Sequence, residues 1–460
     1  MQRVSVDQAI NPRVLRPGSV VYTTGNAATP AVLLRRLAED TSLKRLDLFG
    51  ILLLGEGLEP LFSEATCRRI THRVIFASHL TRQAVNRGWA KYHPMHLSQV
   101  PANLARSRGL DAALISVAGP DNGGNYSLGT TVEAVLAAIH VVKQRGGVVI
   151  AERNATMPFI LGTTIPESAI DYLVDTSYPL PATPVHRPDE AARRIGTQIA
   201  STFLHDGSGT VPGSTLQFGI GEVPEAVTEA IVARGFRDLG IHTELFSSGM
   251  IRLVQAGCVS NRWKRGINFS VSSIFLAEDT AGYAWFNLNS SVQSRPCDYT
   301  NSVFKIAEQP NMVAINSAIG VDLHGNVWAD SLAARSIYSG VGGQSDFLRG
   351  VQYSPGGVAI IALKATTATG ISKIVDKAPA GITTTATPSD RVVLVSEYGI
   401  FDPQRLSIGE RAVAIAHLAE PQSRDNLLRL ITDSPEFHKP RRHRSGRVPG
   451  FTPYEEAMVR

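Results

Sequence analysis

The 460-residue sequence is poor in cysteine, which limits the stabilising or metal-binding sites that it can contain. Its three cysteines are Cys67, Cys258 and Cys297, and their spacing forms no CxxC pair. Disulfide frameworks and structural zinc sites both need paired or clustered cysteines. We therefore expect buried or unreactive thiols, and we expect no metal site.

Long apolar runs are also missing, as are the short motifs of several enzyme classes. No run approaches the roughly 20 apolar residues of a membrane-spanning helix, and the longest, Phe49 to Leu54, has the length of a buried strand. The opening MQRVSVDQ lacks the apolar stretch of a signal peptide, so a cytoplasmic protein without membrane contact is expected. No GxSxG or GxxxxGKS/T motif occurs, which argues against serine hydrolases and P-loop enzymes.

The positive charge is modest and unevenly placed. The formal net charge is +5, and much of the excess lies in HKPRRHRSGR, from His438 to Arg447. A surface for single-stranded nucleic acid would interleave aromatic with basic side chains, and this run has no aromatic residue. We interpret residues 438–460 as a solvated basic tail and expect no nucleic-acid partner. The excess charge suits anionic ligands.

What the sequence does contain is a repeated alternation of strands and helices. Short apolar or β-branched runs are followed by helical stretches such as Pro30 to Asp40 and Val132 to Arg145. The runs are Val20 to Thr23, Ala112 to Val117, Val148 to Ala151, Leu216 to Ile220, Val358 to Leu363 and Val392 to Val395. This alternation predicts an α/β fold with largely parallel sheets.

The two halves of the chain also carry related patterns. Both VVYTTGNAATPAVLL and TLQFGIGEVPEAV contain a strand, then a glycine and, five positions later, a proline that opens a helix. A second similarity joins ALISVAGPDNGGN to AINSAIGVDLHGN. The matching pairs are Gly25 with Gly219, Pro30 with Pro224, Asp121 with Asp322 and Asn125 with Asn326. We infer two tandem open α/β domains with related folds.

The join between the two domains is expected within residues 178–190. The length of the chain favours two domains, and this stretch holds four prolines, which oppose both helix and sheet. We place one domain at 1–185 and a second at 186–437, with the basic tail after it. A helix starting near Asp189 is expected to open the second domain.

Three segments are candidates for chemistry, and the first is LQFGIGEVPEAV at 216–227. A predicted strand ends at Gly219-Ile220-Gly221, and a helix starts near Pro224, a residue favoured in the first turn. Glycines allow close backbone approach, and the free N–H groups of a helix start favour an anion. The alternative is a plain βα turn. A dinucleotide site is not indicated, because Pro224 stands where GxGxxG has its third glycine.

The second segment is DLGIHTELFSSGM at 238–250, in which Glu244 follows a predicted strand from Leu239 to Thr243. Open α/β sheets place ligands at the carboxyl ends of their strands. A carboxylate there can act as a base, a nucleophile or a metal ligand, or it can form a structural ion pair. One His242 and one Glu244 are too few for a metal centre, and His242 is more typical of a structural histidine.

The third segment is YSGVGGQSDFLRG at 338–350, where four glycines surround Gln344 and Asp346. A glycine-rich loop that leads into a helix offers backbone N–H groups to a carbonyl oxygen or a phosphate. An ordinary turn is the alternative.

In this order, the segments resemble the acetyl-CoA hydrolase/transferase family, which includes 4-hydroxybutyrate CoA-transferases. Similar stretches run through almost the whole chain, and GIHTELFSSG and GVGGQSDF are the most specific. The others are NAATPAVLLRRLAE, HLSQVP, DNGGNYSLG, INSAI and VSEYGIFD. The resemblance implies two α/β domains of the CoA-transferase fold, with the active site between them and a possible homo-oligomer.

The resemblance also implies the roles of particular residues. It carries the catalytic glutamate to Glu244. It carries binding of CoA and of the oxyanion to Gly219, Ile220, Gly221, Glu222, Val223, Pro224, Asn316, Gly342, Gly343 and Gln344. The implied reaction moves CoA between an acyl-CoA and a carboxylic acid through an acyl-glutamyl anhydride and a glutamyl-CoA thioester. Coenzyme A is then a substrate, and no metal or other cofactor is needed.

The sequence departs from its relatives beside these motifs. Ser247-Ser248-Gly249 stands where relatives usually have SDG, Gly320 follows INSAI in place of glutamate, and residues 364–367 replace a PSTA-type segment. These changes bear on the acyl group more than on the type of reaction. Two alternatives stay open: an acyl-CoA hydrolase that uses the same site, and a non-catalytic CoA-binding relative. A sugar-phosphate isomerase on the related fold would need a phosphate-binding cluster, and none is distinct.

Overall fold

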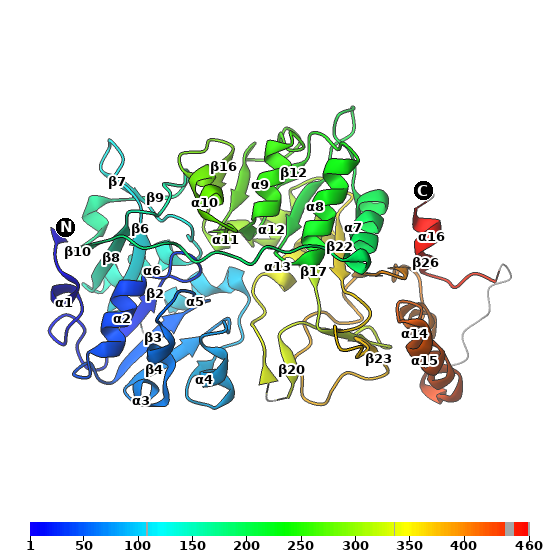
Figure 1. Cartoon of the computed structure of the whole chain (residues 1–460), viewed down its shortest axis with the longest axis horizontal. Coiled ribbons are helices and arrows are strands. Elements are labelled where there is room, and N and C mark those ends of the chain that lie inside the picture. Colours follow the sequence, from blue (N-terminus) through cyan, green and yellow to red (C-terminus); the bar gives the residue numbers. More distant parts are fainter. Residues whose placement is uncertain (107–108, 335, 438–445, 459–460) are drawn as a thin grey trace.

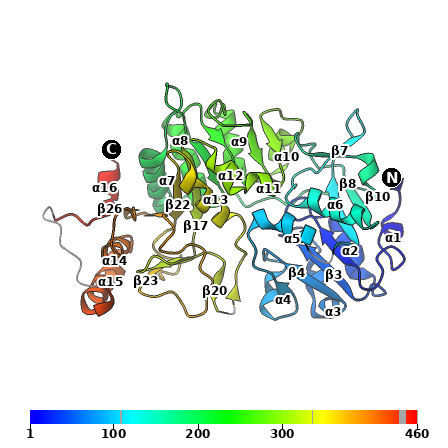
Figure 2. The ribbon, with the colours of Figure 1, turned by 180° about the vertical axis from the view of Figure 1, so that it is seen from behind.

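The computed structural model describes residues 1–106, 109–334, 336–437 and 446–458. Two lobes lie side by side along the long axis of the molecule (Figure 1), and Figure 2 shows them from behind. The N-terminal lobe is built on an eight-stranded sheet and the other lobe on a seven-stranded sheet. An α/β fold with two sheets in tandem is therefore confirmed.

The first sheet is parallel throughout, in the order β1-β10-β8-β6-β2-β3-β4-β5. Its strands are β1 (Gln2–Arg3), β2 (Val20–Thr23), β3 (Leu46–Gly50), β4 (Ile70–Val74), β5 (Lys91–Tyr92), β6 (Ala112–Val117), β8 (Val148–Asn154) and β10 (Tyr172–Thr176). The strands predicted at 20–23 and 112–117 are confirmed in full. The strand predicted from Phe49 to Leu54 is wrong in its bounds, because β3 begins at Leu46 and ends at Gly50.

The second sheet has the order β12-β11-β17-β22-β24-β25-β26. Its strands are β11 (Thr215–Phe218), β12 (Gly240–Ile241), β17 (Met312–Ser317), β22 (Val358–Ala362), β24 (Val393–Ser396), β25 (Gly399–Phe401) and β26 (Phe451–Pro453). The first five are parallel, and β25 and β26 add to the edge in antiparallel pairs. The predicted strand at 239–243 is shortened to two residues in β12.

The internal repeat is visible in this topology. In chain order, β2, β3, β6, β8 and β10 of the first lobe correspond to β11, β12, β17, β22 and β24 of the second, and they occupy the same relative places in the two sheets. The paired loops also agree in detail, since Asn125 N donates to Asp121 Oδ1 at 2.8 Å and Asn326 N donates to Asp322 Oδ1 at 2.9 Å. Each half of the chain therefore repeats one fold.

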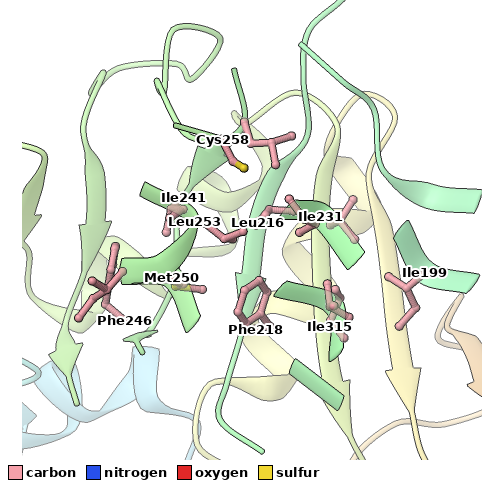
Figure 3. Close-up of a cluster of buried hydrophobic side chains, with 14 of the residues drawn as sticks. Ile199, Leu216, Phe218, Ile231, Ile241, Phe246, Met250, Leu253, Cys258 and Ile315 are labelled. Carbon is pink, nitrogen blue, oxygen red and sulfur yellow. The ribbon is translucent and has the colours of Figure 1, made fainter. Parts of the chain in front are cut away.

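Both faces of the second sheet are buried, as expected of parallel strands between helices. Along β17, Val313 and Ile315 contribute to one apolar cluster, while Met312 and Ala314 contribute to another on the opposite face. Helices α7 (Glu190–Phe203), α8 (Glu222–Ala233) and α9 (Ser248–Gln255) supply side chains to the first cluster. Figure 3 shows Leu216, Phe218 and Ile315 from the strands packing among them.

The connection between the lobes has no regular structure from the end of β10 to α7, in keeping with its prolines. As predicted, α7 begins here: the Asp189 side chain accepts a hydrogen bond from Ala192 N and caps the helix. The exact division at 185 and 186 stays a prediction.

The segment assigned to the basic tail has two parts. Residues 438–445 lie outside the described residues. Beyond them, β26 pairs with β25, and α16 (Tyr454–Ala457) buries Ala457. This end of the predicted tail is packed on the sheet, since β26 forms its edge strand and Phe451 and Ala457 pack against the apolar clusters. Across the described ranges, no helix is both long and apolar enough to cross a membrane.

Candidate active site

The carboxyl ends of the parallel strands in the second sheet meet at one edge, where ligands bind in open α/β sheets. Gly219 follows β11, Asn316 lies near the end of β17, and Glu244 comes three residues after β12. The Glu244 backbone oxygen accepts hydrogen bonds from Ile274 N at 2.9 Å and Ser272 Oγ at 2.8 Å. These bonds fix the turn that directs the Glu244 side chain.

Two N–H donors hold the Glu244 carboxylate. Asn301 Nδ2 donates to Oε2 at 2.8 Å, and the Gly343 backbone N–H donates to the same carboxylate. A Cβ at position 343 would lie only 1.8 Å from Glu244 Oε2 and 1.9 Å from Asn301 Nδ2. The carboxylate therefore sits against bare backbone, and only glycine fits at position 343.

Burial raises the pKa of Glu244 to about 7, although the residue keeps some exposure to solvent. Removal of the carboxylate from water is the largest cause, because a charged group loses hydration there. The hydrogen bond from Asn301 opposes this rise, the nearby negative charge of Asp346 adds to it, and the Gly343 N–H opposes it. At neutral pH the carboxylate is thus divided between its protonated and ionised forms.

Asn301 is held in one orientation by its neighbours. Thr300 Oγ1 donates to Asn301 Oδ1 at 2.8 Å, which leaves the amide N–H groups facing Glu244. Thr300 ends the short helix α11 (Cys297–Thr300), and its carbonyl oxygen lies 2.9 Å from His242 Nε2. Burial lowers the pKa of His242 to about 3, so the ring is neutral and donates Nε2–H to that carbonyl. His242 is structural, as its sequence context indicates.

Asp346 joins the two lobes at this point. It lies in α13 (Gln344–Gly350) and accepts hydrogen bonds from Ser98 N at 3.1 Å and Ser98 Oγ at 2.6 Å. Leu97 N also donates to Gly342 O at 3.0 Å. The second glycine loop is therefore clamped between the N-terminal lobe and Glu244.

The remaining residues of this loop lie close by. Gly342 has a left-handed φ of +57°, and a Cβ there would lie 3.3 Å from the Phe76 ring and 3.7 Å from Glu244 Oε1. Gln344 Nε2 donates to Ser317 O at 3.3 Å, which ties the start of α13 to the end of β17. In the same strand, Asn316 Nδ2 donates to Gln217 Oε1 at 3.0 Å.

The first glycine segment lines a separate, open pocket at the start of α8. Six of the residues at 216–227 line this pocket, together with Ser247, Ser248 and Gly249: Phe218, Gly219, Ile220, Gly221, Pro224 and Glu225. A Cβ on Gly219 would meet no atom within 4 Å, so this backbone is open to a ligand. Glu244 is not in the wall, although Ser247 follows it closely in the chain.

Glu222 and Val223, also predicted as site residues, are turned elsewhere. Glu222 forms an ion pair with Lys364, whose ammonium also contacts Asp189 Oδ2 at 2.7 Å. Val223 packs against the apolar core of the second lobe. The structure thus assembles Glu244, Gly342 and Gly343 in one place, and it places the segment from Gly219 to Pro224 beside a neighbouring pocket.

Sequence reasoning missed the groups that surround the Glu244 carboxylate. Asn301 lies in TNSVF, which carries no recognisable motif, and it reaches Glu244 only through the fold. Asp346 stands within the glycine loop, but nothing in the loop indicated its contact with Ser98. Glu133, whose charge state is coupled to that of Glu244, was not considered.

Comparisons with known proteins show which family the chain resembles over most of its length. Family models of the acetyl-CoA hydrolase/transferase N-terminal and C-terminal domains match residues 6–183 and 280–431. The chain is 35% identical over 386 residues to the 4-hydroxybutyrate coenzyme A transferase of Clostridium kluyveri, covering 83% of this chain and 86% of that protein. It is 34% identical over 426 residues to a succinyl-CoA:acetate/propanoyl-CoA:succinate CoA transferase of Fasciola hepatica, covering 91% and 86%.

A solved structure extends the similarity to three dimensions. RipA from Yersinia pestis superposes with a TM-score of 0.85 at 28% identity, covering 94% of this chain and 97% of that one. Glu244 itself falls between the two ranges matched by the family models.

Proposed function

The chain belongs to the acetyl-CoA hydrolase/transferase family, and on that premise we propose that it transfers CoA between an acyl-CoA and a small carboxylic acid through Glu244. The observation that carries the proposal is the Glu244 carboxylate itself, which is held by Asn301 Nδ2 and Gly343 N–H at the ligand-binding edge of the sheet. A carboxylate in this position can attack a thioester, and the glutamyl carbonyl of the resulting anhydride can then be attacked by the CoA thiolate.

The first half of the reaction consumes the acyl-CoA. A Glu244 oxygen attacks the thioester carbonyl, the C–S bond breaks, and CoA leaves as the thiolate with an acyl-glutamyl anhydride remaining. The thiolate then attacks the glutamyl carbonyl, and the acyl group leaves as a carboxylate. Glu244 is now a CoA thioester. The acceptor acid reverses these steps, so no proton, metal or redox cofactor enters the balance.

The two N–H donors suit the tetrahedral intermediate that forms when a nucleophile adds to the glutamyl carbonyl carbon of Glu244. When thiolate or acid adds to the glutamyl carbonyl, negative charge develops on a former Glu244 oxygen, beside Asn301 and Gly343. Donors fixed before the reaction stabilise such an oxyanion because they need no reorganisation. Loss of one donor of this type lowers turnover by roughly 10²- to 10³-fold.

The pocket at Gly219 to Pro224 is proposed to receive part of the CoA. Open backbone at Gly219 and the N-terminus of α8 favour an anionic or carbonyl group. Binding energy gained there, away from the reacting atoms, can help to drive the steps at Glu244.

A hydrolase is the second candidate, because the family contains acetyl-CoA hydrolases as well as transferases. In that case water, in place of an acid, would clear the glutamyl thioester. An assay with and without acetate as acceptor separates the two: a transferase forms acetyl-CoA and spares the thioester, and a hydrolase releases free CoA at the same rate in both.

The covalent intermediate is the direct test of the proposal. The protein is incubated with each of several acyl-CoA donors without acceptor, treated with borohydride, and its peptides are weighed by mass spectrometry. A thioester at Glu244 is electrophilic and is reduced to an alcohol, whereas a free carboxylate resists the reagent. We expect the mass change in the peptide that contains Glu244, and loss of activity only after exposure to acyl-CoA.

Glu244→Gln is the matched control, since it keeps the size of the side chain and cannot form the thioester by this route. It should remain folded, inactive and unmodified. An unmodified Glu244 peptide together with full activity after saturating acyl-CoA would refute the proposal, as would a Glu244→Gln enzyme that transfers CoA at the wild-type rate.

A further inference from the structure

A second glutamate, Glu133, is buried where the two lobes meet. It lies between β7 (Asn125–Ser127) and α6 (Val135–Gln144). Its backbone oxygen accepts a hydrogen bond from Cys297 N at 3.0 Å, at the start of the helix that leads to Asn301. The preceding residue, Val132, donates to Ser273 O at 2.9 Å. Glu133 thus belongs to the N-terminal lobe and faces the elements that surround Glu244.

The Glu133 side chain is fully buried, yet one of its oxygens has no partner among the described residues. Oε1 accepts from Asn26 Nδ2 at 2.8 Å, while Oε2 has no hydrogen bond. The Oδ1 atom of Asn26 and the hydroxyl of Tyr22 are also buried without partners in this part of the chain. Buried polar atoms are normally paired, so an unpaired group of this kind calls for an explanation, and a catalytic role is one of those known.

Another buried glutamate in the same lobe shows the difference. Glu152 Oε2 accepts hydrogen bonds from Val32 N and Leu33 N, both at 3.0 Å, and Oε1 accepts one from the Tyr178 hydroxyl. Its carboxyl group is satisfied within the protein and holds the start of α2 (Ala31–Glu39) in place. Glu152 is therefore structural, whereas Glu133 keeps one oxygen unused.

The backbone supports the same distinction. Glu133 has φ +31° and its partner Asn26 has φ +52°, in the left-handed region that side chains other than glycine seldom adopt. Such conformations persist where the surroundings enforce them, and they cluster at functional sites. Here two residues in that region are hydrogen-bonded to each other.

The charge state of Glu133 follows from its surroundings. Burial raises its pKa to about 8, the negative charge of Glu244 adds to the rise, and the hydrogen bond from Asn26 opposes it. The other titratable groups near it are the Tyr22 phenol on β2 and the Cys297 thiol on α11, whose own pKa values are raised by burial and by Glu133. At neutral pH Glu133 is a neutral acid whose O–H can donate a hydrogen bond.

Such a donor would suit the binding of the second substrate. The acceptor acid arrives as an anion in a site that already contains Asp346, and the Glu244 carboxylate accepts hydrogen bonds from two neutral donors, Asn301 Nδ2 and the Gly343 N–H. A neutral carboxyl group can bind a carboxylate through a short, charge-assisted O–H···O hydrogen bond. An ionised carboxyl group in the same place would repel it.

We propose that Glu133, as the neutral acid, donates a hydrogen bond from Oε2 to the carboxylate of the acceptor acid and so positions it to attack the CoA thioester on Glu244. This inference rests on the proposed function and adds to it the residue that binds the second substrate. Because the thioester is neutral, the acceptor replaces the negative charge that Glu244 carries in the free enzyme. The number of negative charges beside Glu133 stays the same, and its proton does not have to move.

The test isolates the second half of the reaction. Wild type, Glu133→Ala, Glu133→Gln and the control Glu152→Gln are loaded with acyl-CoA, and the enzyme–CoA thioester is separated by rapid gel filtration. Each is mixed with increasing acetate, and acetyl-CoA formed in a single turnover is measured. Hydroxylamine, a neutral nucleophile that needs no carboxylate-binding group, is used in parallel on the same thioester.

We expect Glu133→Ala to load with CoA but to need roughly ten- to a hundredfold more acetate, the effect of losing one hydrogen bond to a charged group. Its reaction with hydroxylamine should change far less. Glu133→Gln keeps a neutral donor, so it should lose less than the alanine variant. Wild type should slow at alkaline pH as Glu133 ionises, and this decline should be absent in Glu133→Gln. Glu152→Gln should retain the acetate dependence of wild type.

Each outcome decides a separate point. If wild type never forms the thioester, the proposed function fails. If wild type and Glu133→Ala both load but respond equally to acetate, Glu133 does not bind the acceptor. Equal loss towards acetate and hydroxylamine in Glu133→Ala would show a role in shape alone and would overturn the inference. A Glu133→Ala protein that does not fold leaves the decision to the pH profile of Glu133→Gln, where an unchanged alkaline decline overturns it.

Discussion

At the scale of single residues, the protonation of Glu244 governs when the site can react. Only the ionised carboxylate is a nucleophile, and burial raises its pKa to about 7. We therefore expect kcat/KM for acyl-CoA to rise with pH by about tenfold per unit below this value and to level off above it. Initial rates from pH 5 to 8 measure the midpoint.

The negative charge of Asp346 is one cause of the raised pKa, so its removal shifts that midpoint in a defined direction. Asp346→Asn should move the acid limb to lower pH, because ionised Glu244 then has no like charge beside it. Thermal unfolding of the variant serves as the control for its lost contact with Ser98. A midpoint that stays in place, or moves up, would show that Asp346 does not act on Glu244 electrostatically.

The two glycine segments differ in how much space surrounds them, and this gives a matched pair of variants. Gly343→Ala would place its Cβ 1.8 Å from Glu244 Oε2, whereas Gly219→Ala would meet no atom within 4 Å. We expect the first to lower kcat by 10²-fold or more through displacement of the donors. The second should leave kcat nearly unchanged and raise KM for acyl-CoA. Steady-state kinetics of both variants provide the measurement.

Comparable kcat values for the two alanine variants would contradict this reading of the site. Circular dichroism and melting temperature are measured on both, since loss of the fold by Gly343→Ala would also lower kcat. The pair separates contact with the nucleophile from contact with the CoA, which sequence motifs alone do not distinguish.

At the scale of elements, α11 is the part that delivers Asn301 to the nucleophile. His242, just beyond β12, donates to Thr300 O at the end of this helix. His242→Leu leaves that carbonyl unpaired, and we expect a stability loss of about 1–3 kcal/mol together with a fall in kcat as Asn301 shifts. KM for acyl-CoA should change little, because the pocket at Gly219 is separate.

His72 provides the control for this variant. It is also buried, on β4 of the first sheet, and burial lowers its pKa to about 4. His72→Leu should alter stability without altering kcat per folded molecule. Equal kcat losses in the two variants, corrected for folded fraction, would show that His242 does not act through Asn301.

The helices and strands also show which parts of the fold and of the site could be predicted from the sequence. Gly25 and Gly219 lie in similar turns, as do Asp121 and Asp322, and a few neighbouring residues are enough to predict each turn. The corresponding strand orders of the two sheets confirm the repeat. The same local reasoning placed Glu244 after a strand, although β12 ends three residues before it. Asn301 and Glu133 could not be found this way, because each reaches the site through packing of segments distant in the chain.

At the scale of the whole molecule, the two lobes contribute unlike groups to one place. The second lobe provides Glu244, Asn301 and Gly343, and the first provides Ser98, Asn26 and Glu133. Both lobes carry the same fold, but the corresponding strand ends have different neighbours. A Cβ at Gly25 would lie 2.4 Å from Leu52 O, so its backbone is closed, whereas Gly219 is open.

The closed turn at Gly25 leads us to expect one ligand per chain. A protein made of two equivalent halves would titrate two equivalents of ligand, one at each glycine turn. Because the Gly25 turn is filled by the backbone at Leu52, we expect each chain to bind one molecule of CoA and to carry one acyl group at a time. On this expectation the first lobe supplies side chains to the site at Glu244 and forms no second site of its own, so the two repeats of the fold are complementary in function.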